Sequence, residues 1–186
     1  MKGFITKAAT IGSKILEVLH WVLALMLIVL IVLSAAAPSM VNDFLTNAGD
    51  GLDLANLTSG GFGVSVVGID GSVNTTALIM FCIAAFLGMV LTAMIFRNVY
   101  LILTKSKGGS PFTKDNVRMV KEIGIFSIAM PVIGFVMSII TRLVCGVEVA
   151  EISVNFSGLM IGLVVLCLTQ FFAHGVSLEE DVEGLL

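Results

Sequence analysis

Charged residues are scarce in this chain: they make up 12% of its 186 residues, whereas hydrophobic residues make up 58%. Soluble domains carry about a quarter charged residues, so this composition excludes an ordinary soluble domain. Cysteine is also rare, with three residues at scattered positions, and an odd, scattered set argues against a disulfide framework. Cys82 and Cys167 lie within long apolar runs, where we expect them to pack as small apolar side chains.

The sequence also lacks the motifs that carry catalysis or hold metals. It contains no H-E-x-x-H or C-x-x-C pattern, no phosphate-binding glycine loop beside a lysine, and no calcium-loop spacing of its acids. We therefore predict that the protein is not an enzyme and has no catalytic, metal-binding or cofactor-binding residues. Two facing histidines, His20 and His174, would suit a haem or a metal. Each of these histidines stands alone at a polar boundary, so we favour the interpretation that it contacts the backbone or lipid headgroups.

Long apolar runs dominate the rest of the chain. Four of them are almost free of charge: 18–37, 77–103, 119–144 and 156–173. A bilayer core of ~30 Å requires about 20 apolar residues per spanning helix. The sequence thus predicts an all-α membrane protein, with one four-transmembrane-helix bundle over residues 1–186. We interpret the first run as a retained span, because its apolar stretch exceeds the roughly 7–15 residues of a signal-peptide core.

The distribution of positive charge predicts the orientation. Of the ten Lys and Arg residues, all but Arg142 precede the first run or cluster around the join between the second and third runs. Basic residues favour the cytoplasmic side of a membrane. We therefore place both termini, the 104–118 loop and the 174–186 tail in the cytoplasm. The joins 38–76 and 145–155 are predicted to be external.

The two external joins have patterns typical of β-strands. Phe62–Ile69 is predicted to be a strand, and Asp70–Gly71 a two-residue hairpin turn. The 145–155 join alternates β-favouring residues with acids. We predict that the joins pair into a small extracytoplasmic β-hairpin or sheet, and that 42–51 is polar and turn-rich. This element is interpreted either as a solvated lid or as a sensor cap for an external ligand.

Local signals mark the helix ends on the predicted cytoplasmic side. Thr113 is a favourable N-cap for the third long helix. Ser177 with Glu180 has the form of a capping box, which predicts a separate short helix in the tail. Gly158 and Gly162 in the fourth run have a small-xxx-small spacing, which permits either intrachain packing or self-association into a homo-oligomer.

Two segments carry a family resemblance. They are S-P-F-T-K-D-N-V at 110–117 and H-G-V-S-L-E-E-D-V-E-G-L at 174–185. Together they resemble the bacterial family called domain of unknown function 2975, which has an S-P-F-T-x-x-N loop and an H-G-x-x-L-x-x-D tail. The resemblance implies a small four-span protein of the bacterial cytoplasmic (inner) membrane. It also implies a partner, because such proteins are often encoded beside a helix-turn-helix regulator of the Cro/repressor type.

The predicted cytoplasmic face carries a basic cluster and an acidic cluster. One interpretation is a docking surface for a cytosolic protein, with no direct binding of nucleic acid. The alternatives are that the basic residues only orient the spans and touch lipid headgroups, or that loop and tail pair with each other. The residues proposed to bind a partner are Lys105, Lys107, Thr113, Lys114, Asn116, Arg118, Lys121, His174, Glu179, Glu180 and Asp181.

Polar residues within or near the spans form a second candidate set. Ionisable residues inside a membrane are functional hypotheses by default, although near span ends their side chains reach the interface instead. A pairing of Glu17 with Arg97 is one hypothesis. The set comprises Glu17, His20, Arg97, Arg142 and Gln170.

These patterns lead to one functional hypothesis and one alternative. The hypothesis is a small bacterial inner-membrane regulatory or sensory protein that binds a cytosolic helix-turn-helix transcription regulator through its loop and tail. The alternative is a transporter, channel or immunity-type protein that acts within the membrane, for which polar residues or broken helices at mid-depth would be the sign.

Overall fold

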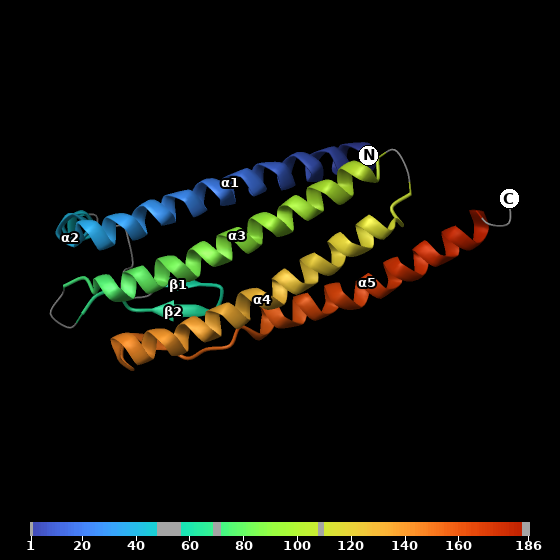
Figure 1. Cartoon of the computed structure of the whole chain (residues 1–186). Helices are drawn as coiled ribbons and strands as arrows, with labels where there is room; N and C mark the ends of the chain where they lie inside the picture. Colours follow the sequence, from blue (N-terminus) through green and yellow to red (C-terminus); the bar gives the residue numbers. More distant parts are fainter. Residues whose placement is uncertain (1, 48–56, 69–71, 108–109, 184–186) are drawn as a thin grey trace. The chain divides into compact units, whose positions relative to one another are not determined.

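The computed structural model describes residues 2–47, 57–68, 72–107 and 110–183. Figure 1 shows that long helices account for most of the chain. The helices are α1 (Lys2–Ala36), α2 (Pro38–Asn47), α3 (Thr75–Lys105), α4 (Lys114–Cys145) and α5 (Phe156–Glu183). The strands β1 (Leu57–Ser59), β2 (Phe62–Val64) and β3 (Ala150–Glu151) form an antiparallel sheet in the order β1-β2-β3.

The four predicted spans are confirmed as four long apolar helices. Stretches of α1, α3, α4 and α5 are each long and apolar enough to cross a membrane. Large apolar residues of α1 remain on its surface, such as Leu25, which is 62% exposed, and Val29, which is 57% exposed. Such exposure suits a lipid environment, since in water it would form a large aggregation-prone patch.

The short helix α2 corrects the prediction that residues 42–51 are turn-rich. Residues 42–47 are helical, whereas 48–51 lie outside the described residues. Pro38 opens the helix at a position where its missing N–H costs nothing. Val41 and Leu45, one helical turn apart, are both 6% exposed. Burial of this pair outweighs the turn preference of the polar residues around it.

The described chain divides into two compact units. The terminal unit comprises Met1–Trp21, Leu91–Ala129 and Ser157–Leu186. The sheet unit comprises Val22–Val90 and Met130–Phe156.

The core of the sheet unit forms around β2 and the residues that follow it. Phe62, Val64 and Val66 alternate with more exposed neighbours and are at most 3% exposed, as expected for one buried face of a strand. They belong to one apolar cluster with side chains of α2, α3 and α4. These partners include Val41, Leu45, Leu78, Cys82 and Met137.

The predicted pairing of the two joins into one sheet is confirmed. β2 pairs with β3 through Gly63–Glu151 and Val64–Ala150, so the join after α4 adds a strand to the hairpin before α3. Val67 and Val73 also form an isolated antiparallel bridge. Residues 69–71, including the predicted Asp70–Gly71 turn, lie outside the described residues.

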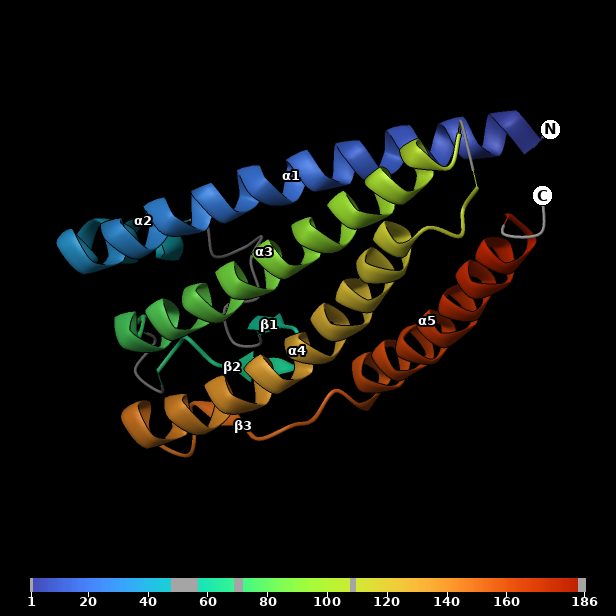
Figure 2. The same ribbon diagram turned by 45° about the vertical axis from the view of Figure 1, so that its right-hand side comes forward.

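The β1–β2 hairpin reaches far along the helices rather than stopping at their ends. Its turn, Gly60–Gly61, has positive φ angles of 60° and 91°, which favour glycine. A Cβ atom added to Gly134 of α4 would lie 2.6 Å from the Gly60 carbonyl oxygen, and one added to Gly88 of α3 would lie 3.7 Å from Ser59 Oγ. Figure 2 shows β1 and β2 between α3 and α4. The hairpin therefore penetrates the sheet unit, a depth that the sequence did not predict.

In the terminal unit, α5 packs closely against α4 through glycines. A Cβ atom on Gly162 would lie 2.4 Å from Ile128 Cγ1, and one on Gly124 would lie 2.7 Å from Leu166 Cδ2. Small residues let helix backbones approach in this way. Of the two alternatives for the small-xxx-small pattern, intrachain packing therefore accounts for Gly162.

The predicted break between the fourth span and a tail helix is wrong. α5 runs without interruption from Phe156 to Glu183. Ser177 Oγ donates a hydrogen bond to the carbonyl oxygen of His174, 3.0 Å away, as a serine inside a helix does. Val176 is 8% exposed, so its burial holds the helix together across the apparent capping box.

Candidate functional site

The segment before α4 and the end of α5 make a set of contacts that we call the loop–tail clasp. The Ser110 hydroxyl donates a hydrogen bond to the Glu179 carboxylate, and Lys114 Nζ lies 2.7 Å from Glu180 Oε1. The Phe112 ring centroid is 5.7 Å from that of Phe172. The clasp comprises Ser110, Phe112, Lys114, Phe172, Gly175, Glu179 and Glu180.

Gly175 provides the space for the aromatic part of the clasp. A Cβ atom at this position would lie 2.5 Å from Phe112 Cδ1, so the ring rests directly on the backbone of α5. Phe112 is nevertheless 41% exposed. The clasp is thus a surface contact between segments at least 60 residues apart, with one aromatic anchor and two polar contacts.

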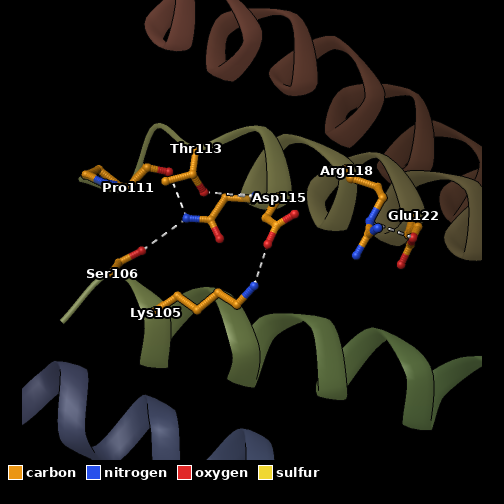
Figure 3. A network of polar contacts seen from close by, with 8 residues as sticks. Lys105, Ser106, Pro111, Thr113, Asp115, Arg118 and Glu122 are labelled. Carbon is orange, nitrogen blue, oxygen red and sulfur yellow. Dashed lines mark hydrogen bonds and ion pairs between the residues drawn. The ribbon is translucent and has the colours of Figure 1, made fainter. Parts of the chain in front are cut away.

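The start of α4 is fixed by a local hydrogen-bond network, part of which is drawn in Figure 3. The predicted N-cap is confirmed, because Thr113 Oγ1 accepts a hydrogen bond of 3.2 Å from the Asn116 backbone N–H. The Asn116 amide is fully buried and donates to the Pro111 carbonyl oxygen at 2.9 Å and to Ser106 Oγ at 3.4 Å. Asn116 therefore joins both ends of the loop to the first turn of α4.

We expect Asn116→Ala to lower the free energy of unfolding by about 1–3 kcal/mol, because the fully buried Asn116 amide loses its two hydrogen bonds, to the Pro111 carbonyl oxygen and to Ser106 Oγ, at about 0.5–1.5 kcal/mol each. The measurement is the midpoint of unfolding of the purified protein in mixed micelles with increasing dodecyl sulfate. Lys121→Ala, an exposed position on the same helix, is the control and should change the free energy by less than about 0.5 kcal/mol. Equal midpoints for the two variants would contradict a structural role for the Asn116 amide.

Two further ion pairs lie near the clasp (Figure 3). Lys105 Nζ is 2.7 Å from Asp115 Oδ2, and Arg118 Nε is 3.6 Å from Glu122 Oε1. Asp115 lies outside the predicted spans, and the pKa of its carboxyl group is lowered. The larger cause is the hydrogen bond from Lys105, and the positive charge of Lys105 adds to it. Exposed pairs of this kind each contribute about 0–1 kcal/mol.

The structure brings together most of the residues proposed to bind a partner. Four of them form ion pairs within the chain, and one of these pairs, Lys114 with Glu180, is the loop–tail pairing that the sequence left as an alternative. Lys107, Lys121 and Asp181 take part in none of the ion pairs found among the described residues. The side chain of His174 is exposed. The four paired residues are Lys105, Lys114, Arg118 and Glu180.

The proposed pairing of Glu17 with Arg97 is wrong. Glu17 is 7% exposed and its carboxylate lies 3.0 Å from Lys14 Nζ, whereas Arg97 is exposed. Lys14 also lies over the Tyr100 ring, 5.1 Å from its centroid. The buried Glu17 carboxylate is therefore paired with Lys14, three residues before it on the same helix, rather than with a residue of another helix.

The remaining polar candidates do not converge on one site. His20 donates from Nδ1 to the Leu16 carbonyl oxygen at 2.7 Å, and its ring is 5.4 Å from that of Phe96. Gln170 is exposed and Arg142 is half-buried. Among the described residues, no group of three or more His, Cys, Asp or Glu side chains is placed to hold a metal ion.

Sequence reasoning missed a buried polar contact between α3 and α4. Asn98 is 4% exposed and donates from Nδ2 to Glu122 Oε2 at 2.9 Å. The available signal was a lone acid inside the third apolar run, four residues after Arg118. Glu122 therefore accepts a hydrogen bond from Asn98 of α3 and forms an ion pair with Arg118 of its own helix, α4.

Four helices that are long and apolar enough to cross a membrane, together with a small sheet, indicate a multi-pass membrane protein. No family model, curated protein or solved structure matches the chain. The resemblance to domain of unknown function 2975 therefore stays a prediction based on residues 110–117 and 174–185.

Proposed function

We propose that the protein is a small regulatory or sensory protein of the bacterial inner membrane, with both termini in the cytoplasm. Its loop–tail surface holds or releases a cytosolic helix-turn-helix regulator. The observation that carries the proposal is the loop–tail clasp, because it gathers both resembling motifs into one exposed contact. The orientation is supported by the charge distribution, in which Arg142 is the one basic residue of ten that is predicted to lie on the external side.

The energetics of the clasp suit exchange with a partner. Lys114 and Glu180 form an ion pair in which their own side chains are 79% and 56% exposed. Their mutual attraction is therefore weak in water. A soluble protein that offers a carboxylate to Lys114 and a basic group to Glu180 replaces this contact at little cost. The closed clasp is then the state without a partner, and the open clasp is the state that binds one.

The test is capture of a soluble partner by the full chain, purified in mild detergent from its own host. We expect a helix-turn-helix protein to copurify with the natural sequence. Neutralising three exposed basic residues of this face in the variant Lys114→Gln/Arg118→Gln/Lys121→Gln should abolish the capture, because charge-assisted contacts contribute most when several act together.

Arg142→Gln is the matched control, since it removes the one basic residue predicted to lie on the opposite side. It should leave capture unchanged. Correct insertion of each variant is checked by the accessibility of its termini in right-side-out vesicles. If the triple variant inserts correctly and still captures the partner, the docking surface is misassigned.

One observation favours the alternative of an activity within the membrane. The Gly60–Gly61 turn places non-helical backbone beside Met130 and Gly134, well inside α4, and the side chain of Ser59 lies beside Gly88 of α3. Non-helical backbone at membrane depth occurs where it is buried in protein or lines a cavity, and in transporters it marks the substrate site. Ion flux into liposomes that contain the purified protein, absent from protein-free liposomes, distinguishes this function from regulation.

A further inference from the structure

One face of the three-stranded sheet is polar and lines a cavity. Thr58 of β1, Gly63 of β2 and Glu151 of β3 lie opposite one another in the register of the sheet. Because side chains alternate along a strand, this row occupies the face opposite the buried side chains of β2. Ser65, two residues after Gly63, and Glu148 extend the lining. The polar face therefore carries hydroxyl and carboxylate groups around a glycine that leaves space above the sheet.

The helices of the sheet unit place this unit within a membrane. Their stretches 22–36, 75–90 and 130–141 contain no Asp, Glu, Lys or Arg. Each stretch belongs to a helix that is long and apolar enough to cross a bilayer. Charge-free helices of this kind cross the hydrocarbon core. A polar sheet face beside them is therefore unexpected unless it lies beyond the helix ends.

The tip of the β1–β2 hairpin shows that the sheet does not lie beyond the helix ends. A Cβ atom on Gly134, 11 residues before the end of α4, would lie 2.6 Å from the Gly60 carbonyl oxygen. A Cβ atom on Gly88, 13 residues after the start of α3, would lie 3.7 Å from Ser59 Oγ. At about 1.5 Å per residue, the tip is roughly 16–20 Å from the nearer ends of these helices. It lies beyond the middle of a ~30 Å hydrocarbon core.

The polar row is at membrane depth as well, because Thr58 and Gly63 are each two residues from the turn, or roughly 7 Å nearer the helix ends. Glu148 and Glu151 are exposed and take part in none of the ion pairs found among the described residues. An unpaired carboxylate and the open edge of a sheet are both unfavourable against lipid at this depth. Water in the cavity satisfies both groups. The cavity volume is about 290 Å³, whereas one water molecule requires roughly 10–15 Å³ on the same measure.

We propose that the polar face of the sheet lines a water-filled vestibule, which opens to the external side and admits cations in preference to anions. The opening is external because both joins that form the sheet lie at the helix ends remote from the 104–118 loop. The charged residues of the lining are Glu148 and Glu151, and walls of low dielectric constant focus their negative field. The vestibule goes beyond the proposed function and uses no contact of the loop–tail clasp. Partner capture and water access can therefore fail independently.

The test measures how fast single cysteines react with charged methanethiosulfonates, which do not cross membranes, added outside right-side-out vesicles. The background is the full chain with Cys145→Ser and Cys167→Ser, which retains only the buried Cys82. Thr58→Cys reports on the vestibule, and Leu25→Cys, at a 62% exposed position of α1, is the lipid-facing control. We expect Thr58→Cys to react roughly a hundredfold faster, because a reactive thiolate forms in water but not in hydrocarbon. Labelling after unfolding in dodecyl sulfate confirms that each thiol is intact.

The cation preference is measured with a trimethylammonium reagent and a sulfonate reagent of similar size. The ratio of their rates is divided by the ratio for a small free thiol in water, which removes their intrinsic difference. For Thr58→Cys and for Ser65→Cys, a second reporter, we expect this quotient to be roughly ten. Glu148→Gln/Glu151→Gln should bring it close to one. Asp43→Asn removes an exposed carboxylate of α2 outside the cavity lining and should leave it unchanged.

Three results would overturn the proposal. If neither Thr58→Cys nor Ser65→Cys reacts from outside, although both react after unfolding, water does not reach the polar face. Reaction in inside-out vesicles alone would place the opening on the cytoplasmic side. A quotient that does not fall in Glu148→Gln/Glu151→Gln would remove the cation preference. Fast external reaction, with a quotient near ten that only this double variant abolishes, supports the vestibule.

Discussion

Gly134→Ala is expected to lower the free energy of unfolding by about 2 kcal/mol, because the new methyl group meets backbone atoms that have no room to move. Its Cβ would lie 2.6 Å from the Gly60 carbonyl oxygen and 3.2 Å from the Phe62 backbone nitrogen. Gly60 is already in the left-handed region, with φ at 60°. Phe62 is fully buried, so the hairpin cannot shift away without disturbing the core of the sheet unit. The measurement is the unfolding midpoint in mixed micelles.

Gly12→Ala is the control for this prediction. Nothing lies within 4 Å of a Cβ atom at Gly12, which is also inside a helix. Alanine is favoured over glycine in a helix by up to about 1 kcal/mol, so this variant should be slightly more stable than the natural protein. If Gly134→Ala were stabilised to the same extent, the hairpin turn would not contact α4.

The larger variant Gly134→Val separates steric conflict from a general effect of substitution. Its two additional methyl groups increase the overlap with the hairpin, and valine has a lower helix propensity than alanine. We therefore expect a graded loss of stability from glycine to alanine to valine. A loss that does not grow with side-chain size would point to a cause other than the contact with Gly60.

The parts of the fold that were predicted correctly depend on strong, local patterns. Long charge-free runs gave the four helices, because each apolar residue in them contributes to the same signal. The pairing of the two joins followed from their β-favouring residues. The helix α2 was missed because only two of its residues with a described exposure, Val41 and Leu45, are buried, and polar residues stand between them.

The depth of the hairpin had no signal in the sequence. Gly88 and Gly134 are ordinary members of apolar helices until the β1–β2 hairpin is known to approach them. Charge pairing between loop and tail was one of the alternatives drawn from the sequence, but the aromatic part of the loop–tail clasp had no such signal. Phe112 and Gly175 are distant in sequence, and their contact depends on how α5 packs against α4. Contacts between distant segments are set by packing of whole elements, which local propensity does not encode.

Two errors at the site arose from local patterns that had a better interpretation. Lys14 lies three residues before Glu17, and such a spacing on a helix favours pairing over a partner on another helix. The S-x-x-E pattern at Ser177 was interpreted as a helix start, although the same spacing occurs inside helices. By contrast, the Thr113 N-cap was predicted correctly because a loop with Gly and Pro precedes it.

Gly162→Ala is expected to lower the free energy of unfolding by about 2 kcal/mol through separation of α4 and α5 in the terminal unit. The new Cβ would lie 2.4 Å from Ile128 Cγ1, and 3.0 Å from both the Gly124 carbonyl oxygen and the Ile128 backbone nitrogen. Ile128 can adjust its side chain, but the two backbone atoms force the helices apart. The unfolding midpoint measures the loss, and the molar mass in detergent shows whether self-association changes.

A double-mutant cycle with Ile128→Ala identifies the contact responsible. Removal of the Ile128 side chain deletes the nearest atom but leaves the Gly124 and Ile128 backbone atoms in place. The second substitution should therefore recover only part of the stability lost in Gly162→Ala, with a coupling free energy of about 0.5–3 kcal/mol. If Gly162 instead served self-association, Gly162→Ala would lower the molar mass without this coupling. Intrachain packing predicts the opposite pattern, with coupling present and the molar mass unchanged.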